Sequence, residues 1–300
     1  MLANPNARAA LLALFASAIL SFIDNFVYSV SQEAGIWQFQ IVRTLFAIPI
    51  LLIIGRLTRY SLRPVNWGKL MLRSLAVSTG LLIYFASLGI LPVAQAGAGL
   101  YSAPIWVVLF AALLFSIRIT AFQLLAITAG FAGVLMLLQP DLEGLSKLSF
   151  LPLAAGLFYG LGMLLTPHLC AKESPITLTI GVITTIGLIS LGFLIYFSAF
   201  PSENPTFLTK GWVLPTPRFL WLTLFQALGA VIAVSCISQA YRIGTPSYVA
   251  VVEYSFLIFA SLWSYLLWGT TTNALSIIGI AVILISGAAL SRHNSKPAEQ

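Results

Sequence analysis

Three ionisable side chains lie inside long apolar stretches of the sequence: Asp24, Arg43 and Glu253. A charged group at bilayer depth costs several kcal/mol unless it faces protein or water, so such residues are candidates for a functional site. The chemistry that they offer is ion pairing and the uptake and release of a proton. They therefore direct attention to the helices that would have to hold them.

Asp24 and Arg43 belong to the first and second apolar stretches. Counted at 1.5 Å per helical residue, their depths agree to within a few ångströms. We predict that they pair across the two helices. The pair has two interpretations, a neutralised strut that holds these helices together or a group that contacts substrate or gates the protein.

Glu253 has no obvious ionic partner at its depth, which makes it the stronger candidate for a site residue. It could exchange a proton or hold a cationic group of a ligand. The alternative is a protonated glutamate that is hydrogen-bonded to the backbone or to Tyr241.

Several aromatic side chains lie within the apolar stretches rather than at their ends, where the polar handle of a tyrosine or tryptophan needs a partner or cavity water. We expect these residues to form a cavity wall suited to an amphipathic or ring-bearing solute, with packing between helices as the alternative. The binding candidates are Tyr84, Tyr101, Ser102, Tyr159, Glu253, Tyr254 and Trp263.

The elements that must position these residues are membrane-spanning helices. Hydrophobic residues make up 59% of the 300 residues and charged residues only 8%, a balance that leaves a water-soluble domain too little polar surface. A span needs about 20 apolar residues. The sequence predicts ten spans: Arg8 to Ser31, Gly35 to Leu57, Trp67 to Ile90, Val93 to Phe115, Thr120 to Leu138, Leu148 to His168, Ile176 to Phe200, Phe219 to Tyr241, Thr245 to Trp268 and Asn273 to Ser291.

The charge distribution predicts an orientation. With a cytoplasmic N-terminus, that side collects eleven basic residues and the other side only Lys147, Lys210 and Arg218, and a bias of this kind places both termini in the cytoplasm. The eleven are Arg8, Arg56, Arg59, Arg63, Lys69, Arg73, Arg118, Lys172, Arg242, Arg292 and Lys296. We therefore expect a multi-pass protein of the plasma (inner) membrane.

The second five spans echo the first five. Aligning Tyr101 and Ser102 with Tyr254 and Ser255 also superposes several leucines and isoleucines. Because each unit has an odd number of spans, two copies must cross the membrane in opposite senses, which is the architecture of an inverted repeat. We expect repeats over 8–140 and 148–291; chance self-similarity of apolar helices is the alternative.

Several classes are excluded by motif and composition. The net charge of +7 comes from short loops between apolar spans, where it attracts lipid headgroups rather than nucleic acid. The two cysteines indicate neither a disulfide framework nor a metal site. No catalytic triad, zinc-binding pair or phosphate-binding loop is present, so we expect neither an enzyme nor a cofactor.

The order of several short motifs resembles the EamA-type members of the drug/metabolite transporter superfamily. They are Ser21-Phe22-Ile23-Asp24-Asn25, Trp37-Gln38 with Arg43, Leu72-Arg73-Ser74, Leu91-Pro92-Val93-Ala94-Gln95-Ala96, Ser102-Ala103-Pro104, Gln239-Ala240-Tyr241 with Pro246, and Glu253-Tyr254. The resemblance covers nearly the whole chain. It implies ten helices in two inverted five-helix units around a central cavity. The Gly-Glu that many relatives carry after the fourth and ninth spans is missing here, so no role for that glutamate carries over.

The expected function is export or exchange of a small metabolite by alternating access, and the sequence leaves open whether the transport is coupled to protons. An amino acid, a nucleoside-like compound or an amphipathic or cationic solute would suit the expected cavity. A lipid or prenyl-carrier translocase of the same architecture is the alternative. Membrane lipids are the other expected partner, and the sequence leaves the oligomeric state open.

Overall fold

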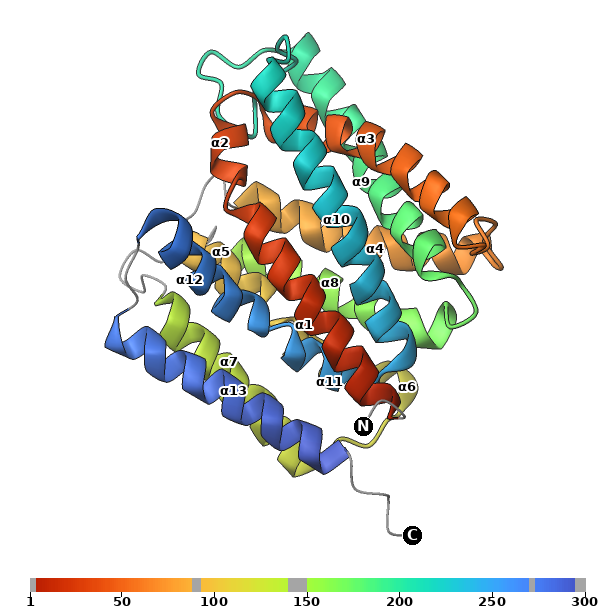
Figure 1. Cartoon of the computed structure of the whole chain (residues 1–300), viewed down its shortest axis with the longest axis vertical. Helices are drawn as coiled ribbons and strands as arrows, with labels where there is room; N and C mark the ends of the chain where they lie inside the picture. The colour runs from red at the N-terminus through yellow and green to blue at the C-terminus, as the bar shows by residue number, and fades with distance from the viewer. Residues whose placement is uncertain (1–3, 88–92, 140–149, 270–272, 295–300) are drawn as a thin grey trace.

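The computed structural model describes residues 4–87, 93–139, 150–269 and 273–294, and this part of the chain forms thirteen α-helical segments and no strand (Figure 1). The expected boundary between the two halves, at 140–148, lies outside the described residues, as do Leu91 and Pro92 of the fourth motif. Seven helices are uninterrupted: α3 Ile36–Leu57, α4 Trp67–Ser87, α7 Ala121–Leu138, α8 Leu151–Leu169, α9 Pro175–Ala199, α10 Pro217–Ile243 and α13 Ala274–Asn294.

Three further spans are each broken into two helices. The pairs are α1 Pro5–Asp24 with α2 Val27–Ser31, α5 Val93–Leu100 with α6 Ala103–Phe115, and α11 Pro246–Val252 with α12 Ser255–Trp268. The interruptions fall at residues 25–26, 101–102 and 253–254, so Asp24, Tyr101 and Glu253 all lie at a break. A break frees backbone groups from the helical ladder, and in a membrane such positions are tolerated where protein or a cavity surrounds them.

Polar residues start the helices where the sequence offers a cap. The Thr120 hydroxyl accepts a bond from the Gln123 amide nitrogen, and the Gln123 side chain accepts one from the Thr120 nitrogen. The Ser174 and Thr216 hydroxyls cap α9 and α10 by accepting from the amide nitrogens of Thr177 and Phe219, and each cap is followed by proline. These contacts satisfy amides that the first helical turn leaves unpaired.

Among the described helices, eight stretches are long and apolar enough to cross a membrane. They cover eight of the ten expected spans. Helices α8 and α13 occupy the other two but are not among the eight; Tyr159, the glycines of α8 and its last residues Pro167 and His168 dilute the apolar content of that helix. The structure is therefore all-helical, with eight candidate membrane spans.

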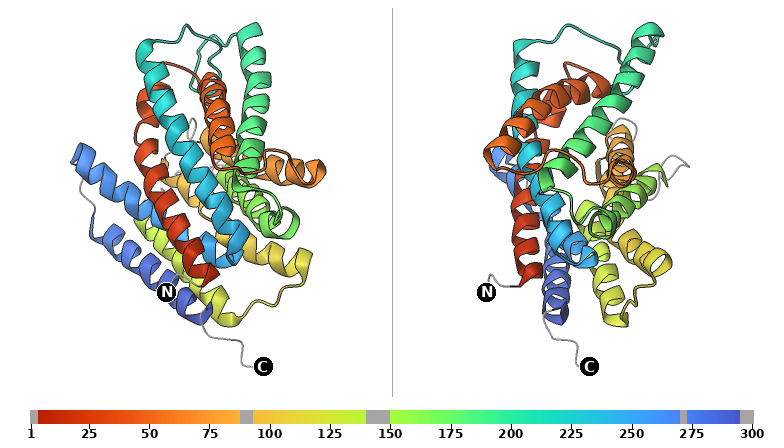
Figure 2. Two further views of the ribbon diagram at one scale, coloured as in Figure 1. Left: turned by 45° about the vertical axis from the view of Figure 1, so that its right-hand side comes forward. Right: turned by 90° about the vertical axis from the view of Figure 1, so that its right-hand side faces the viewer.

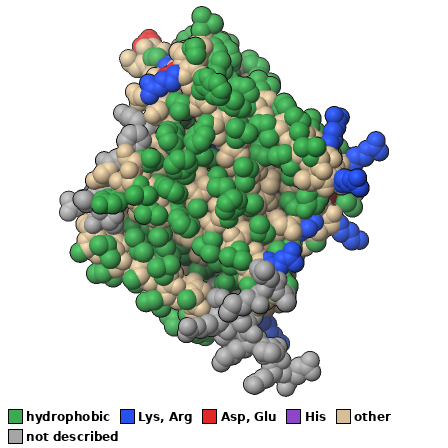
Figure 3. Space-filling model, viewed as in Figure 1, with side chains coloured by type: hydrophobic (Ala, Val, Ile, Leu, Met, Phe, Trp, Pro, Cys, Tyr) green, Lys and Arg blue, Asp and Glu red, His purple; other side chains and the backbone are tan. Residues whose placement is uncertain are grey.

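The surface of the bundle is apolar. Leu45, Leu113, Ile195, Trp221 and Ile285 are all more than 60% exposed. Figure 3 shows hydrophobic side chains across one face of the molecule, with Lys and Arg gathered at the margins. An exposed apolar area of this extent suits lipid rather than water as the solvent.

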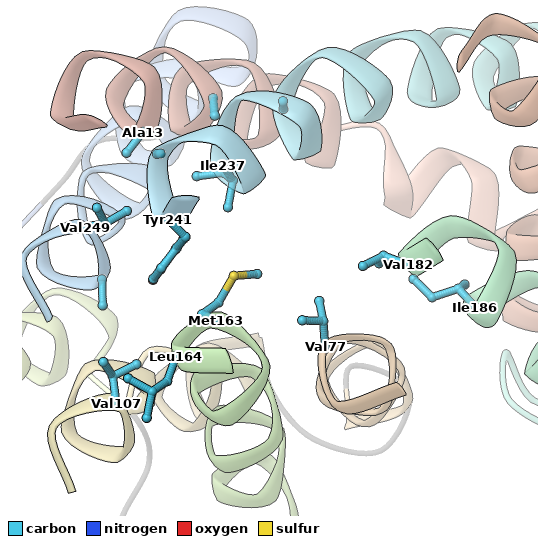
Figure 4. Packing of buried hydrophobic residues seen from close by; sticks show 14 of the residues in the cluster. Ala13, Val77, Val107, Met163, Leu164, Val182, Ile186, Ile237, Tyr241 and Val249 are labelled. Atoms are coloured by element: carbon cyan, nitrogen blue, oxygen red, sulfur yellow. The ribbon is translucent and has the colours of Figure 1, made fainter. Parts of the chain in front are cut away.

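Helices pack in pairs that are distant in sequence: α4 on α8, α1 on α10, α3 on α9 and α7 on α13 (Figures 1 and 2). The start of α1 and the end of α13 lie at the same end of the molecule in these views. Small residues permit the closest approach, since a Cβ atom added at Gly80 of α4 would lie 2.6 Å from the Tyr159 nitrogen of α8. The pairs surround a core to which Val77, Met163 and Ile237 contribute from three different helices (Figure 4).

Candidate functional site

A cavity of about 110 Å³ lies among the helices that carry the ionisable residues. Its wall is built from α1, α3, α4, α8 and α10, together with the two spans broken at 101–102 and 253–254. Most of the lining is apolar. The polar part comprises one serine, four charged side chains and three tyrosines: Ser17, Asp24, Arg43, Arg73, Glu253, Tyr84, Tyr101 and Tyr159.

Glu253 follows α11 directly and is held by two phenols. The Tyr159 hydroxyl donates a 2.6 Å hydrogen bond to Oε1, and the Tyr241 hydroxyl donates to Oε2. The contact with Tyr241 is the one considered from the sequence, whereas Tyr159 was expected only to line a cavity. Because each carboxylate oxygen accepts one phenolic hydrogen bond, the Glu253 side chain joins α8 to α10.

Arg73 corrects an expectation. The sequence placed it among the basic connector residues, but it lies inside α4 with 0% of its surface exposed, and it lines the cavity. Its Nε donates to Thr166 Oγ1 at 3.0 Å, Nη1 to the Leu178 carbonyl at 3.1 Å and Nη2 to Ser238 Oγ at 3.4 Å. The signal that could have found it is its position inside the expected third span.

Asp24 and Arg43 line the same cavity from α1 and α3. No direct salt bridge joins these two residues; the one ion pair found within the described ranges is Arg218–Glu33 at 3.7 Å. The Arg43 guanidinium instead lies 5.7 Å from the centre of the Phe39 ring. The structure thus brings the predicted partners to one chamber without a direct salt bridge between them.

Three of the binding candidates are not among the cavity-lining residues. Ser102 donates to the Gly99 carbonyl at 2.6 Å and accepts from Trp106 at 3.1 Å. Tyr254 is fully buried in a hydrophobic cluster, with its ring 6.5 Å from that of Tyr101. Trp263 donates to the Ala18 carbonyl at 3.1 Å, outside the cavity wall.

The geometry describes a multi-pass membrane protein with a charged internal chamber, and similarity to known proteins names its family. Residues 7–139 and 147–292 each match the model described as the EamA-like transporter family. Together these segments span almost all of the chain, which therefore belongs to that family.

Relatives of known name cover nearly the full length. A riboflavin transporter of Rhizobium johnstonii is 26% identical over 89% of this chain and 82% of its own length. One from Vibrio cholerae is 23% identical over 96% and 94%. The pseudopaline exporter CntI of Pseudomonas aeruginosa is 22% identical over 94% and 95%. A solved crystal structure of another protein superposes with a TM-score of 0.78 over 97% of this chain and 99% of that one at 17% identity, which shows a shared fold.

Proposed function

We propose that this protein is a secondary transporter that exports or exchanges a small metabolite by alternating access. The observation that carries the proposal is the cavity: two guanidinium groups, two carboxylates and three tyrosines meet inside a bundle whose outer surface is apolar. Charged groups buried at this depth face protein or a water-filled cavity, and they are typical of substrate pathways.

The chemistry of the wall favours a dipolar or amphipathic solute. Arg43 and Arg73 balance Asp24 and Glu253 when all four are ionised, so the chamber is close to neutral and presents both signs of charge. Tyr84, Tyr101 and Tyr159 add flat apolar surface for a ring. Relatives named for riboflavin and pseudopaline transport are consistent with a small organic solute, such as an amino acid, a nucleoside-like compound or an amphipathic cation.

Transport of such a solute requires movement. The cavity of about 110 Å³ is smaller than the roughly 300–1,000 Å³ of ordinary ligand pockets. The helices around it therefore separate when a substrate of that size binds. Glu253 is the proposed site of proton exchange, and Asp24 with Arg43 is the proposed gating or structural pair.

We also propose ten spans in two inverted repeats, with α8 and α13 completing the eight candidate spans. If the two halves are exchanged, the contact between α4 and α8 becomes the contact between α10 and α1. The contacts between α3 and α9 and between α7 and α13 stay the same under this exchange. The breaks at 101–102 and 253–254 occur in matching spans. These correspondences support repeats over 8–140 and 148–291.

The proposed location is the plasma (inner) membrane with both termini in the cytoplasm. Without Arg73, the connectors and helix ends on the proposed cytoplasmic side still carry Arg56, Arg59, Arg63, Lys69, Arg118, Lys172 and Arg242, whereas the opposite side has Lys147, Lys210 and Arg218. That excess of positive charge supports the orientation.

The test is counterflow in proteoliposomes. Purified protein is loaded with unlabelled solute and exposed to labelled amino acids, nucleosides, riboflavin and cationic drugs, with and without a pH gradient. We expect at least one of these solutes to accumulate above protein-free liposomes, and to do so less with Glu253→Gln than with the exposed-loop control Glu203→Gln. Scrambling of a fluorescent lipid without exchange of any soluble probe would overturn the proposal in favour of a translocase.

A further inference from the structure

Two glutamates outside the spans make matching contacts at opposite ends of the bundle. Glu33 lies just before α3 and Glu173 lies just before α9. The Glu33 carboxylate contacts Thr216, the residue that caps α10. The Glu173 carboxylate contacts Asn66, the residue that caps α4. In the proposed repeat, both contacts join the connector after the first span of one half to the third span of the other half.

The Glu173 contact is made to the backbone. Its Oε1 accepts from the amide nitrogens of Val65 and Asn66 at 2.8 and 2.9 Å. Ser174 and Thr177 reinforce it by donating to the Ser61 carbonyl at 2.8 and 2.7 Å. Glu173 is only 2% exposed, so water does not compete for these bonds, and a carboxylate at a helix N-terminus is also favoured by the helix dipole.

The Glu33 contact is built from side chains. Its carboxylate accepts from the Thr216 hydroxyl, and Arg218 Nε lies 3.7 Å away. The Lys210 ammonium group donates to the Glu33 carbonyl at 3.2 Å. Trp37 of α3 donates to the Leu208 carbonyl at 2.6 Å, so the connector between α9 and α10 is also bound to the start of α3.

The two contacts lie at opposite faces. Glu33 precedes α3, whereas Val65 and Asn66 follow it, and α3 has 22 residues. At 1.5 Å per residue its ends are roughly 33 Å apart, about the thickness of a bilayer core. In Figure 1 the connector between α9 and α10 lies beside α2 at one end, and the other end of α3 lies far from it.

The helices held by these contacts form the cavity. Helix α4 carries Arg73 and Tyr84 of the wall, and α10 carries Ile237 of the wall and Tyr241, which binds Glu253. Holding or releasing the start of α4 or α10 therefore acts directly on the chamber.

Each contact also leaves one oxygen without a hydrogen bond. Glu173 Oε2 is buried with no hydrogen-bond donor within the described part of the chain, and Glu33 Oε1 is buried with only the 3.7 Å ion pair to Arg218 Nε. A buried acceptor without a donor loses its solvation without compensation. The closed contacts are consequently less stable than fully paired ones, as suits bonds that must open once in every cycle.

We propose that Glu33 and Glu173 are the latches of the two gates, one at each membrane face. The proposal rests on the transport function proposed above and names the residues that regulate access to its site. Release of Glu173 opens the chamber at the face of the 58–66 connector while Glu33 stays bound, and release of Glu33 opens the opposite face.

Access to a cysteine in the cavity tests this assignment. Cys170→Ser and Cys236→Ser remove the native thiols, and Ser17→Cys places a reporter of similar size in the wall. A membrane-impermeant charged methanethiosulfonate is added to right-side-out and to inverted vesicles, and the labelling rate is measured from each face. Glu203→Gln, on the exposed connector between α9 and α10, is the matched control.

With Glu173→Gln we expect roughly tenfold faster labelling from the face of the 58–66 connector and slower labelling from the other face, equivalent to about 1.4 kcal/mol of lost latch stability. Glu33→Gln should reverse the pattern. If Glu173→Gln is not monodisperse in detergent, Glu173→Asp, which keeps the charge but shortens the side chain, should shift the rates in the same direction by less.

Two results overturn the inference and are distinguishable. If the parent is labelled from both faces and neither glutamate variant shifts the ratio relative to Glu203→Gln, the latches are wrong and alternating access survives. If the reporter is reached from one face only in every variant, alternating access fails, and the latch assignment fails with it.

Discussion

The Tyr159 hydroxyl of α8 donates a 2.6 Å hydrogen bond to the Glu253 carboxylate at the break between α11 and α12. Tyr241 of α10 donates to the other carboxylate oxygen. One acidic side chain thereby links three segments of the cavity wall. Protonation or ligand binding at Glu253 must weaken or rearrange these bonds, which couples the chemistry of the site to the positions of the helices.

Glu253→Gln should lower the rate of solute exchange by about tenfold or more and remove most of its pH dependence. The amide is close in size but cannot exchange a proton in the working pH range, and it accepts hydrogen bonds more weakly than a carboxylate. Exchange is measured in proteoliposomes between about pH 5.5 and 8, the range around neutrality in which proton-coupled exchange would change its rate. Fast exchange with an unchanged pH profile would eliminate proton coupling at this residue.

Tyr159→Phe and Tyr241→Phe should each reduce exchange by about tenfold or more, because a hydrogen bond to a charged group contributes roughly 1.5–3 kcal/mol. Combined with Glu253→Gln, neither change should add its full single-variant effect, since the bond partner is already altered. Kinetics of the single and double variants provide the measurement. Fully additive losses would show that the phenols act independently of Glu253.

Arg73→Lys should impair both folding and exchange. Lysine keeps the charge but cannot reproduce the fork that reaches Thr166, Leu178 and Ser238. We expect a lower thermal unfolding temperature in detergent and at least tenfold slower exchange, whereas Arg63→Lys in the exposed connector should change neither. Equal behaviour of the two variants would contradict a site role for Arg73.

Asp24→Asn separates the two interpretations of Asp24 and Arg43. If the pair contacts substrate or gates the chamber, exchange should fall at least tenfold while the protein stays folded and monodisperse. If the pair is a strut, the loss should appear in the unfolding temperature instead. Retained exchange with normal stability would remove Asp24 from both roles.

Gly80→Val should separate α4 from α8. The added Cβ would lie 2.6 Å from the Tyr159 nitrogen and 2.8 Å from the Ala155 carbonyl oxygen, both backbone atoms that cannot move alone. Overpacking of this kind costs about 1–3 kcal/mol, so the unfolding temperature should drop. Gly192→Ala is the control, because nothing lies within 4 Å of its Cβ position. Similar melting of both variants would refute the close contact.

The sequence identified three of the four charged residues of the chamber because a charge is conspicuous in an apolar helix. Asp24, Arg43 and Glu253 were all found in this way, and all three line the cavity. Arg73 was missed because it lies six residues after Trp67, about 9 Å along the helix. Sequence alone does not show where the connector ends and the hydrocarbon begins.

The rotation of each helix could not be predicted. A span that is apolar on all sides has no amphipathic stripe to indicate which face is buried. For this reason Tyr84 and Tyr159 could not be separated in advance from Tyr254 and Trp263, although only the first two line the chamber. The two donors to Glu253 lie 94 and 12 positions away from it, and only the tertiary structure brings them together.

The hydrogen-bond partners of Arg73 are all synthesised long after Arg73 itself. Thr166, Leu178 and Ser238 follow it by 93, 105 and 165 residues, so a ribosome adding roughly 5–20 residues per second needs about 5–20 s to produce even the first of them. During that interval the guanidinium has none of its final partners. Until the second half of the polypeptide arrives, the nascent α4 therefore carries a charge whose insertion into lipid costs several kcal/mol unless water reaches it.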